Sequence, residues 1–228
     1  MQLRRRLLKV LAAAGVFGPA GIVGLVSQAL AMGKVPIAPG VYKMRGVVTV
    51  NGKPARLGQL IGLGDTVVTG SDSEAVYVIG QDAFLQRDNT TLLFGADAAK
   101  SFFRIVTGKV LSVFGKSQDK RMLQATTATI GIRGTGCYIE DEGSGNAART
   151  YLCLCYGSIE LTPSAAPHER ESYSTRHHER PLYIYNDMKM PTMIAPAGFI
   201  NHTDDELTLL ESLVGRWPAF FGRGDAKY

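Results

Sequence analysis

Cysteine is scarce in this sequence, with three residues in a chain of 228. Three cysteines are too few for the disulfide framework of a small secreted protein, so a hydrophobic core has to hold the fold. Hydrophobic residues make up 45% of the chain, which supplies such a core and excludes a disordered polar tail. We therefore expect one compact domain of ordinary size.

Acidic residues are absent from residues 1–31, and this absence accounts for most of the positive charge of the chain. The formal net charge is +5, from 25 Lys and Arg against 20 Asp and Glu, and four of the basic residues lie in that segment. Beyond residue 31 the basic and acidic residues nearly balance. A surface that binds nucleic acid normally carries an excess of Lys and Arg on the folded domain, so DNA or RNA binding is not expected.

Residues 1–31 have the three-part organisation of an export signal. Arg4 and Arg5 open a basic start, an apolar stretch follows, and Ala29 and Ala31 provide a small-residue cleavage site. The arginine pair, followed by two leucines and a lysine, resembles the twin-arginine consensus. That resemblance implies export of a folded protein to the periplasm of a bacterial cell. The alternatives are an ordinary secretory leader and a leader that stays uncut as a membrane anchor.

Helical periodicity is missing from residues 42–161. Short runs rich in Val, Ile, Thr, Phe and Tyr end every few residues at Gly, Asn or Asp, which is typical of β-strands joined by tight turns. Gly108 lies between two such runs and is predicted to form a hairpin. The pattern predicts an all-β fold, specifically a jelly-roll-like antiparallel β-sandwich, and argues against a parallel βαβ architecture.

The sequence changes character after this strand region. Residues 162–201 contain several prolines, many charges and three histidines, and we expect a His-containing flap or extension. Residues 202–228 are predicted to form a short C-terminal helix and an aromatic tail that pack on the β domain. Thr203 and Glu206 have the spacing of a helix-capping box, and leucines then recur at helical spacing.

Two glycine-containing motifs occur in order within the strand region. Their residues are Gly64, Asp65 and Gly70 in the first motif and Gly131, Arg133, Gly134 and Thr135 in the second. The glycines permit tight backbone bends, and Arg133 can reach carbonyl or carboxylate groups that fix a turn. No nucleophile and base accompany Arg133, so no catalytic residue is predicted.

The ordered pair of motifs resembles the FecR domain, and the resemblance covers residues 42–161. It implies a periplasmic all-β domain of the type found in iron-dicitrate regulators, which take part in signal transduction and iron regulation by relaying receptor occupancy to a sigma factor. Those regulators carry a cytoplasmic segment before a membrane span, whereas nine residues precede the apolar stretch here. We therefore expect an exported, non-enzymatic module that binds an envelope protein or ligand and meets the membrane only through an uncut leader.

Three cysteines and four histidines carry the remaining chemistry. Cys153 and Cys155 are two residues apart in a predicted strand, so both side chains project from the same face. A register that opposes Cys137 to Cys153 would bring the third thiol to the same patch. The histidines that could complete this patch are His177 and His178 in the flap, with His168 and His202 as further candidates.

Three thiolates and one imidazole are a familiar ligand set for zinc or for an iron–sulfur cluster. Two other interpretations remain open from the sequence. The cysteines can be inert thiols in a buried strand. Alternatively, Cys137 and Cys153 can form a cross-strand disulfide in the oxidising periplasm, which leaves Cys155 unpaired.

Overall fold

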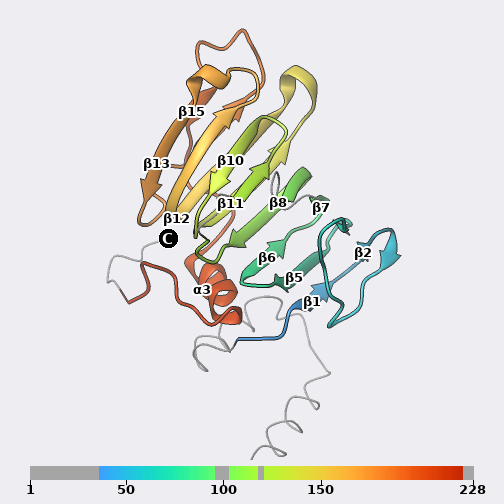
Figure 1. Ribbon diagram of the computed structural model, residues 1–228. Helices are drawn as coiled ribbons and strands as arrows, with labels where there is room; N and C mark the ends of the chain where they lie inside the picture. The colour runs from blue at the N-terminus through green and yellow to red at the C-terminus, as the bar shows by residue number, and fades with distance from the viewer. Residues whose placement is uncertain (1–35, 96–102, 118–120, 223–228) are drawn as a thin grey trace, which may run out of the picture.

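The computed structural model describes residues 36–95, 103–117 and 121–222 (Figure 1). The strands of this part of the chain are β1 (Gly40–Arg45), β2 (Val48–Val50), β3 (Lys53–Pro54), β4 (Thr66–Thr69), β5 (Glu74–Ile79), β6 (Asp82–Gln86), β7 (Thr90–Phe94), β8 (Phe103–Val113), β9 (Arg121–Gln124), β10 (Ala128–Ile132), β11 (Gly136–Glu142), β12 (Arg149–Pro163), β13 (Glu171–Thr175), β14 (Leu182–Tyr185) and β15 (Ile194–Pro196). One α-helix, α3 (Asp204–Leu213), follows them. The predicted all-β class with a short C-terminal helix is confirmed.

Five of the strands form a closed ring. β8 pairs with β11, β11 with β12, β12 with β10, β10 with β9, and β9 again with β8. The β8–β9 pairing is parallel and the other four are antiparallel. Closure leaves these strands without a free edge at the seam. The remaining strands extend the sheet from this ring.

Two long strands make the closure possible because each changes partners halfway along its length. The first half of β8 pairs with β7 and β9, and its second half pairs with β6 and β11. β12 pairs with β11 and β14 first, and then with β10 and β13. The changes occur at Gly108 and Gly157, whose φ angles of 95° and 100° favour glycine. The predicted hairpin at Gly108 is therefore wrong, because the strand bends there and continues.

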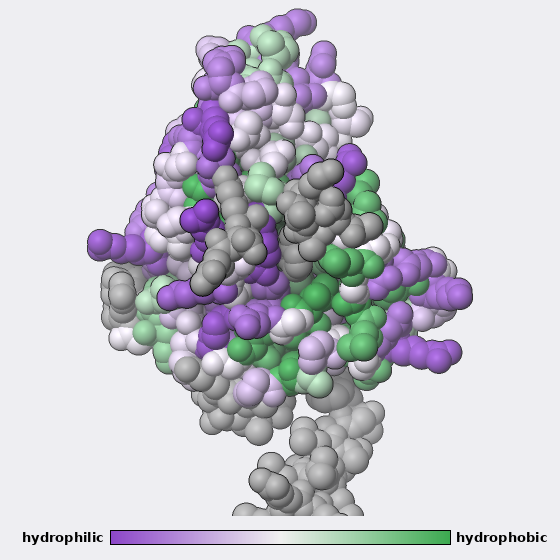
Figure 2. Space-filling view, viewed as in Figure 1, coloured by the Kyte–Doolittle hydropathy of each residue, from purple (hydrophilic) through white to green (hydrophobic). Residues whose placement is uncertain are grey.

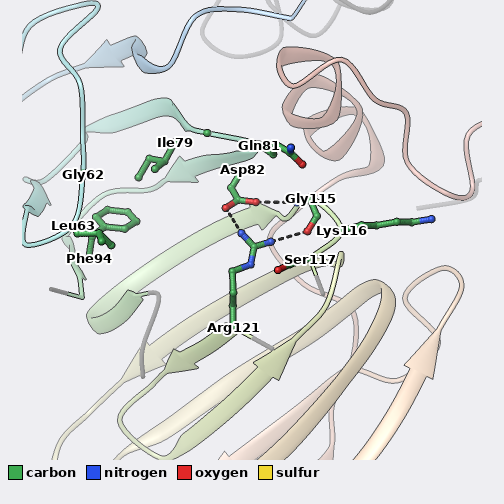
Figure 3. A pocket seen from close by; sticks show the side chains of 11 residues that line it. Gly62, Leu63, Ile79, Gln81, Asp82, Phe94, Gly115, Lys116, Ser117 and Arg121 are labelled. Carbon is green, nitrogen blue, oxygen red and sulfur yellow. Dashed lines mark hydrogen bonds and ion pairs between the residues drawn. The ribbon is translucent and has the colours of Figure 1, made fainter. Parts of the chain in front are cut away.

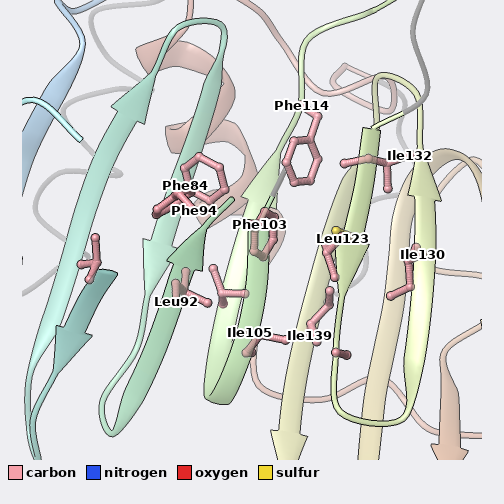
Figure 4. Close-up of a cluster of buried hydrophobic side chains, with 14 of the residues drawn as sticks. Phe84, Leu92, Phe94, Phe103, Ile105, Phe114, Leu123, Ile130, Ile132 and Ile139 are labelled. Carbon is pink, nitrogen blue, oxygen red and sulfur yellow. The ribbon is translucent and has the colours of Figure 1, made fainter. Parts of the chain in front are cut away.

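Aromatic side chains fill the first of two hydrophobic clusters. Phe84 lies at its centre, with ring centroids 5.3 Å from Tyr77, 5.5 Å from Phe94 and 5.6 Å from Phe103. Figure 4 shows the cluster continuing through Ile105, Leu123 and Ile130 into the five-stranded ring. These residues face inward because they occupy alternate positions of their strands.

The second cluster lies on the opposite face of β5, β6, β8, β11 and β12, and helix α3 covers it. Leu207, Leu210 and Leu213 of α3 are buried there. The helix starts as the sequence predicts: Thr203 is the N-cap, its hydroxyl accepts from the Glu206 amide, and the Glu206 carboxylate accepts from the Thr203 amide. The strands between the two clusters are thus buried on both faces.

The segment expected to be a flap contributes three strands. β13 and β14 both pair with β12, and β15 pairs with β14. In β13 the residues alternate between half-buried and exposed, and the exposed positions are Ser172 and Ser174. The charges and prolines obscured this alternation in the sequence.

The family-like motifs have structural roles. Gly64 (φ 88°) and Gly134 (φ 62°) occupy positive-φ turns, and Asp65 accepts a hydrogen bond of 2.8 Å from the Gly62 amide. The Gly70 amide donates to the Val47 carbonyl, and Thr135 is buried. Gly131 is a regular strand residue of β10 rather than a bend. Arg133 is exposed and makes no hydrogen bond or ion pair within the described residues, so it does not fix the turn as predicted.

The predicted signal residues Arg4, Arg5, Ala29 and Ala31 lie outside the described residues. Among the residues that the structure describes, no helix is both long and apolar enough to cross a membrane.

Candidate metal centre

Two cysteines and two histidines meet between β12 and the start of α3. Cys153 and Cys155 project from one face of β12, as the sequence predicts, and His178 and His202 approach from the segments after β13 and before α3. One donor atom from each of the four residues lies within 4.8 Å of the others, and all four residues are buried. Segments far apart in the sequence thus place four good metal ligands around one point.

The distances within this cluster fit a single tetrahedral ion. His178 Nδ1 lies 3.3 Å from Cys153 Sγ and 3.3 Å from His202 Nε2, and His202 Nε2 lies 3.4 Å from Cys155 Sγ. Zinc bound at about 2.3 Å from sulfur and about 2.05 Å from nitrogen separates its tetrahedral ligands by roughly 3.4 Å (N–N) and 3.6 Å (S–N). The three measured separations are therefore close to those between the ligands of one tetrahedral zinc ion.

The second nitrogen of each imidazole also has a partner. His178 Nε2 lies 3.0 Å from Asp204 Oδ1, and His202 Nδ1 lies 2.7 Å from the carbonyl oxygen of Ile200. Each acceptor favours a proton on that outer nitrogen, which leaves the inner nitrogen with a lone pair directed at the thiols. Metal-binding histidines are held in this way, by a carboxylate or a backbone carbonyl behind the ring.

Backbone conformation and ring packing hold the two histidines in place. His178 has a φ of 55°, a left-handed conformation that is uncommon outside glycine, and its amide donates to the Cys155 carbonyl at 3.0 Å. The ring of His202 stacks on Tyr138 with centroids 4.5 Å apart. The Phe199 ring packs edge-on against the His178 ring, with centroids 4.7 Å apart. A constrained backbone and an apolar surround are both features of preorganised sites.

Burial and hydrogen bonding move the pKa values of the cluster apart. A hydrogen bond from Cys155, aided by His178 and His202, outweighs burial and lowers the pKa of Cys153 to about 4. Burial raises the pKa of Cys155. Burial also disfavours the charged form of His178, but hydrogen bonds to Asp204 and Cys153 prevail and raise the pKa of His178 to about 9. Metal binding requires deprotonated thiols and imidazoles with a free lone pair, so binding a cation would release protons from this cluster.

Cys137 is not part of this centre. β11 and β12 pair Cys137 with Leu154 and Tyr138 with Cys153, after an irregularity between Gly136 and Cys137. The pairing is one residue away from the predicted register, and such a shift moves a side chain to the opposite face of the sheet. Cys137 is consequently buried in the first hydrophobic cluster, whereas Cys153 and Cys155 belong to the second.

This register also contradicts the predicted disulfide. Cys137 and Cys153 lie on opposite faces, and all three cysteines are free thiols. The buried position of Cys137, together with a pKa that burial raises strongly, fits the interpretation of an inert thiol for this cysteine alone.

The predicted histidines divide between two roles. His178 is a candidate ligand, but His177 is not in the group with the two thiols, and its Nε2 atom lies 2.8 Å from Asp204 Oδ2. His202, which the sequence offered only as a further candidate, occupies the fourth position, and His168 is exposed in a 3-10 turn at Pro167–Glu169. Asp204 was not recognised in the sequence, where it counted only as a favourable charge at a helix start.

A second feature, a surface pocket of about 510 Å³, lies away from this cluster (Figure 3). Asp82 and Arg121 form an ion pair on its wall, and both also bind the backbone of Gly115. These bonds connect β6, β9 and the loop after β8. The charged pair therefore stabilises the fold and does not present a binding group of its own.

The pocket is bordered by part of the apolar surface of the molecule. Leu63, which is 54% exposed, lies at its rim, and Figure 2 shows apolar surface gathered in the lower half of this face. Among the residues that the structure describes, the polar side chains lining the pocket are those of the ion pair and of Gln81, Lys116 and Ser117. The Cys–His cluster is the stronger candidate site.

No family model and no curated protein matches the sequence. Two crystal structures of a putative anti-sigma factor from Parabacteroides distasonis ATCC 8503 are similar at 6% sequence identity, each with a TM-score of 0.47. The similarity covers 58% of this chain and 59% of that chain.

Proposed function

We propose that this protein binds one zinc ion through Cys153, Cys155, His178 and His202. The observation that carries the proposal is the arrangement of the two imidazoles. Each ring directs one nitrogen into the cluster, at 3.3 to 3.4 Å from a cysteine sulfur, and binds an acceptor with the other. A buried set of two thiols and two imidazoles without a metal would gain little from such orientation, whereas a metal requires it.

The geometry favours a single ion over an iron–sulfur cluster. A cluster distributes its protein ligands over two or more iron atoms, which separates the outermost donors by more than one coordination shell. Here all four donors lie within 4.8 Å of one another. Two thiolates and two imidazoles in a tetrahedron are typical of zinc, and four protein ligands leave no open position for a substrate. We therefore propose a structural ion in a non-enzymatic protein.

We propose that this module is exported and binds an envelope protein or ligand as a FecR-type domain. The support comes from the sequence, where the arginine pair precedes an apolar stretch and the two glycine motifs follow in order. The twin-arginine resemblance implies folding before export, and a metal inserted in the cytoplasm would suit that route. The jelly-roll-like sandwich remains a proposal for how the strands outside the five-stranded ring pack.

Elemental analysis of the full chain, purified with its leader attached, tests the metal proposal. We expect about one zinc per chain, and tetrahedral, thiolate-bound visible absorption after replacement with cobalt. Cys155→Ser should lose the metal. Cys137→Ser is the matched control, because it removes a buried thiol from the other face of the same sheet and should keep the metal.

Protein that contains no zinc, and takes up none when it is added in slight excess, would contradict the proposal. Equal metal loss in Cys137→Ser and Cys155→Ser would also contradict the proposal. That result would mean either that the ion binds all three cysteines or that it binds at no defined site. Stoichiometric iron and acid-labile sulfide in the purified protein would show that the site holds an iron–sulfur cluster and not zinc.

A further inference from the structure

We propose that the metal ion is a latch that holds the C-terminal segment, residues 197–222, closed over the second hydrophobic cluster. This inference rests on the proposed zinc site and adds a consequence: occupancy of the site controls whether α3 is docked. The C-terminal segment contributes the ligand His202 and, through Asp204, the carboxylate behind His178, while β12 contributes the two thiols.

The ligands connect the helix start directly to the core strand. His202 precedes the N-cap Thr203, and Asp204 is the first residue of α3. The Asp204 carboxylate accepts hydrogen bonds from the Nε2 atoms of His177 and His178, at 2.8 and 3.0 Å. An ion on His202 and the two cysteines would therefore fasten the N-terminus of α3 to β12 both through a ligand and through the carboxylate behind a second ligand.

The segment has an apolar face that must be covered. Leu207, Leu209, Leu210 and Leu213 are buried, and they pack in the same cluster as Leu85 and Leu111 of the sheet. A ten-residue helix is too short to be stable on its own in water, where about 12–15 residues are needed even for favourable sequences. Release of the segment would thus unfold α3 and expose the apolar face of the sheet together.

Several ion pairs and hydrogen bonds also connect the segment to the rest of the fold. Glu206 pairs with Arg87, and the side chains of that pair are 11% and 21% exposed. Glu211 pairs with Arg216 and accepts from Tyr156, yet burial still raises the pKa of Glu211, so its ionised form is disfavoured by its surroundings. Asn201 donates to Glu140 at 2.7 Å. Taking such largely buried pairs out of water costs free energy that offsets much of their attraction, so their net contribution is small and an ion can decide the balance.

The size of the effect follows from linkage. If His202 reaches the thiols only in the docked state, an ion that binds this state suppresses opening by a factor of one plus the ratio of its free concentration to its Kd. At a hundredfold excess over Kd, opening of α3 is suppressed about a hundredfold. Amide exchange in the helix reports this opening directly when reclosing is fast.

Hydrogen exchange of the full chain, followed by mass spectrometry with buffered free zinc and after chelation, tests the latch. We expect chelation to accelerate exchange about a hundredfold in residues 204–213, and in the chelated protein these amides should exchange faster than those of β10, because α3 can then open while the sheet stays folded. Cys155→Ser should exchange like the chelated protein in the presence of zinc, and Cys137→Ser like the loaded protein. If a variant does not fold, the loaded and chelated native chain still decides the question.

The outcomes separate the two proposals. Stoichiometric zinc with unchanged exchange in residues 204–213 would overturn the latch and leave the zinc site standing. Stoichiometric zinc with equal protection of α3 and β10 amides in the chelated protein would also overturn the latch, because α3 would then open only when the whole fold unfolds. Failure to bind zinc would overturn both.

Discussion

Asp204 shows how much of the candidate site depends on a residue that supplies no ligand atom. Its carboxylate lies between His177 and His178, and its side chain is 13% exposed. These two hydrogen bonds overcome the effect of burial and lower the pKa of Asp204, which therefore stays ionised beside the rings. An ionised acceptor behind His178 fixes the ring and makes its inner nitrogen a better donor to a metal.

We expect Asp204→Asn to weaken zinc binding by about 10- to 100-fold, the usual effect of losing a carboxylate behind a ligating histidine. Competition with a chromophoric chelator measures the change. Asp205→Asn is the matched control, because Asp205 also lies in the first turn of α3 but is exposed and makes no hydrogen bond or ion pair within the described residues. Equal losses in the two variants would attribute the effect to the helix start and not to His178.

At the residue scale, the sequence predicts three of the four candidate ligands, Cys153, Cys155 and His178, and offers His202 as a further candidate. Cys153 and Cys155 share a face because side chains alternate along a strand, and this depends on no partner. The position of Cys137 depends on a register that an irregularity at Gly136 shifts by one residue, and no local pattern reveals that shift. His202 is 47 residues from Cys155, so only the fold brings the two together.

At the scale of elements, Gly157 lets β12 pass from one set of partners to the next. Its φ is 100°, and a Cβ atom there would lie 2.8 Å from Thr135 Cγ2 and 3.0 Å from the Gly134 carbonyl oxygen. Both the backbone angle and the close approach exclude other residues. The bend also lies two residues after Cys155, so it defines where the thiol face of β12 ends.

We expect Gly157→Ala to lower the free energy of unfolding by about 3 kcal/mol, from backbone strain and a steric clash together. Gly80→Ala is the control for strain alone, because Gly80 has a φ of 59° and open space around a Cβ; it should lower the same free energy by about 1 kcal/mol. Urea denaturation of both variants measures the difference. Equal values would mean that Thr135 and Gly134 move aside without penalty.

The elements themselves differ in how well local sequence predicts them. Helix α3 is predicted correctly because Thr203 and Glu206 form a local capping box. The continuous β8 was predicted as two strands because Gly108 has the same signature in a bend as in a hairpin. The sequence predicts a flap in place of β13 and β14 because both strands are short and are flanked by charged residues and proline, a composition typical of loops.

At the scale of the whole molecule, β8 and β12 belong to both halves of the sheet, and the two hydrophobic clusters lie on its opposite faces. The all-β class follows from the strand pattern along the chain. Ring closure does not, because it depends on the parallel pairing of β8 with β9 and on bends whose direction the sequence leaves open. The first cluster needs no metal for its packing, whereas the second is completed by α3.

This division predicts that zinc changes the cooperativity of unfolding. Trp217 is the single tryptophan of the chain and stacks on Phe221 at 4.1 Å in the C-terminal segment, so its fluorescence reports on that segment. Far-UV circular dichroism reports mainly on the strands. With zinc bound, we expect the two signals to change together during urea denaturation, because opening of the segment is suppressed until the sheet unfolds.

After chelation, the Trp217 signal should change at a lower urea concentration than the circular dichroism signal, since α3 can then open while the aromatic cluster around Phe84 stays packed. Phe84→Leu is the complementary control: it weakens the first cluster by about 1 kcal/mol and should move the circular dichroism midpoint while leaving the zinc-dependent separation in place. Coincident transitions in both the loaded and the chelated protein would mean that the two clusters unfold as one unit and that the ion does not act on the C-terminal segment separately.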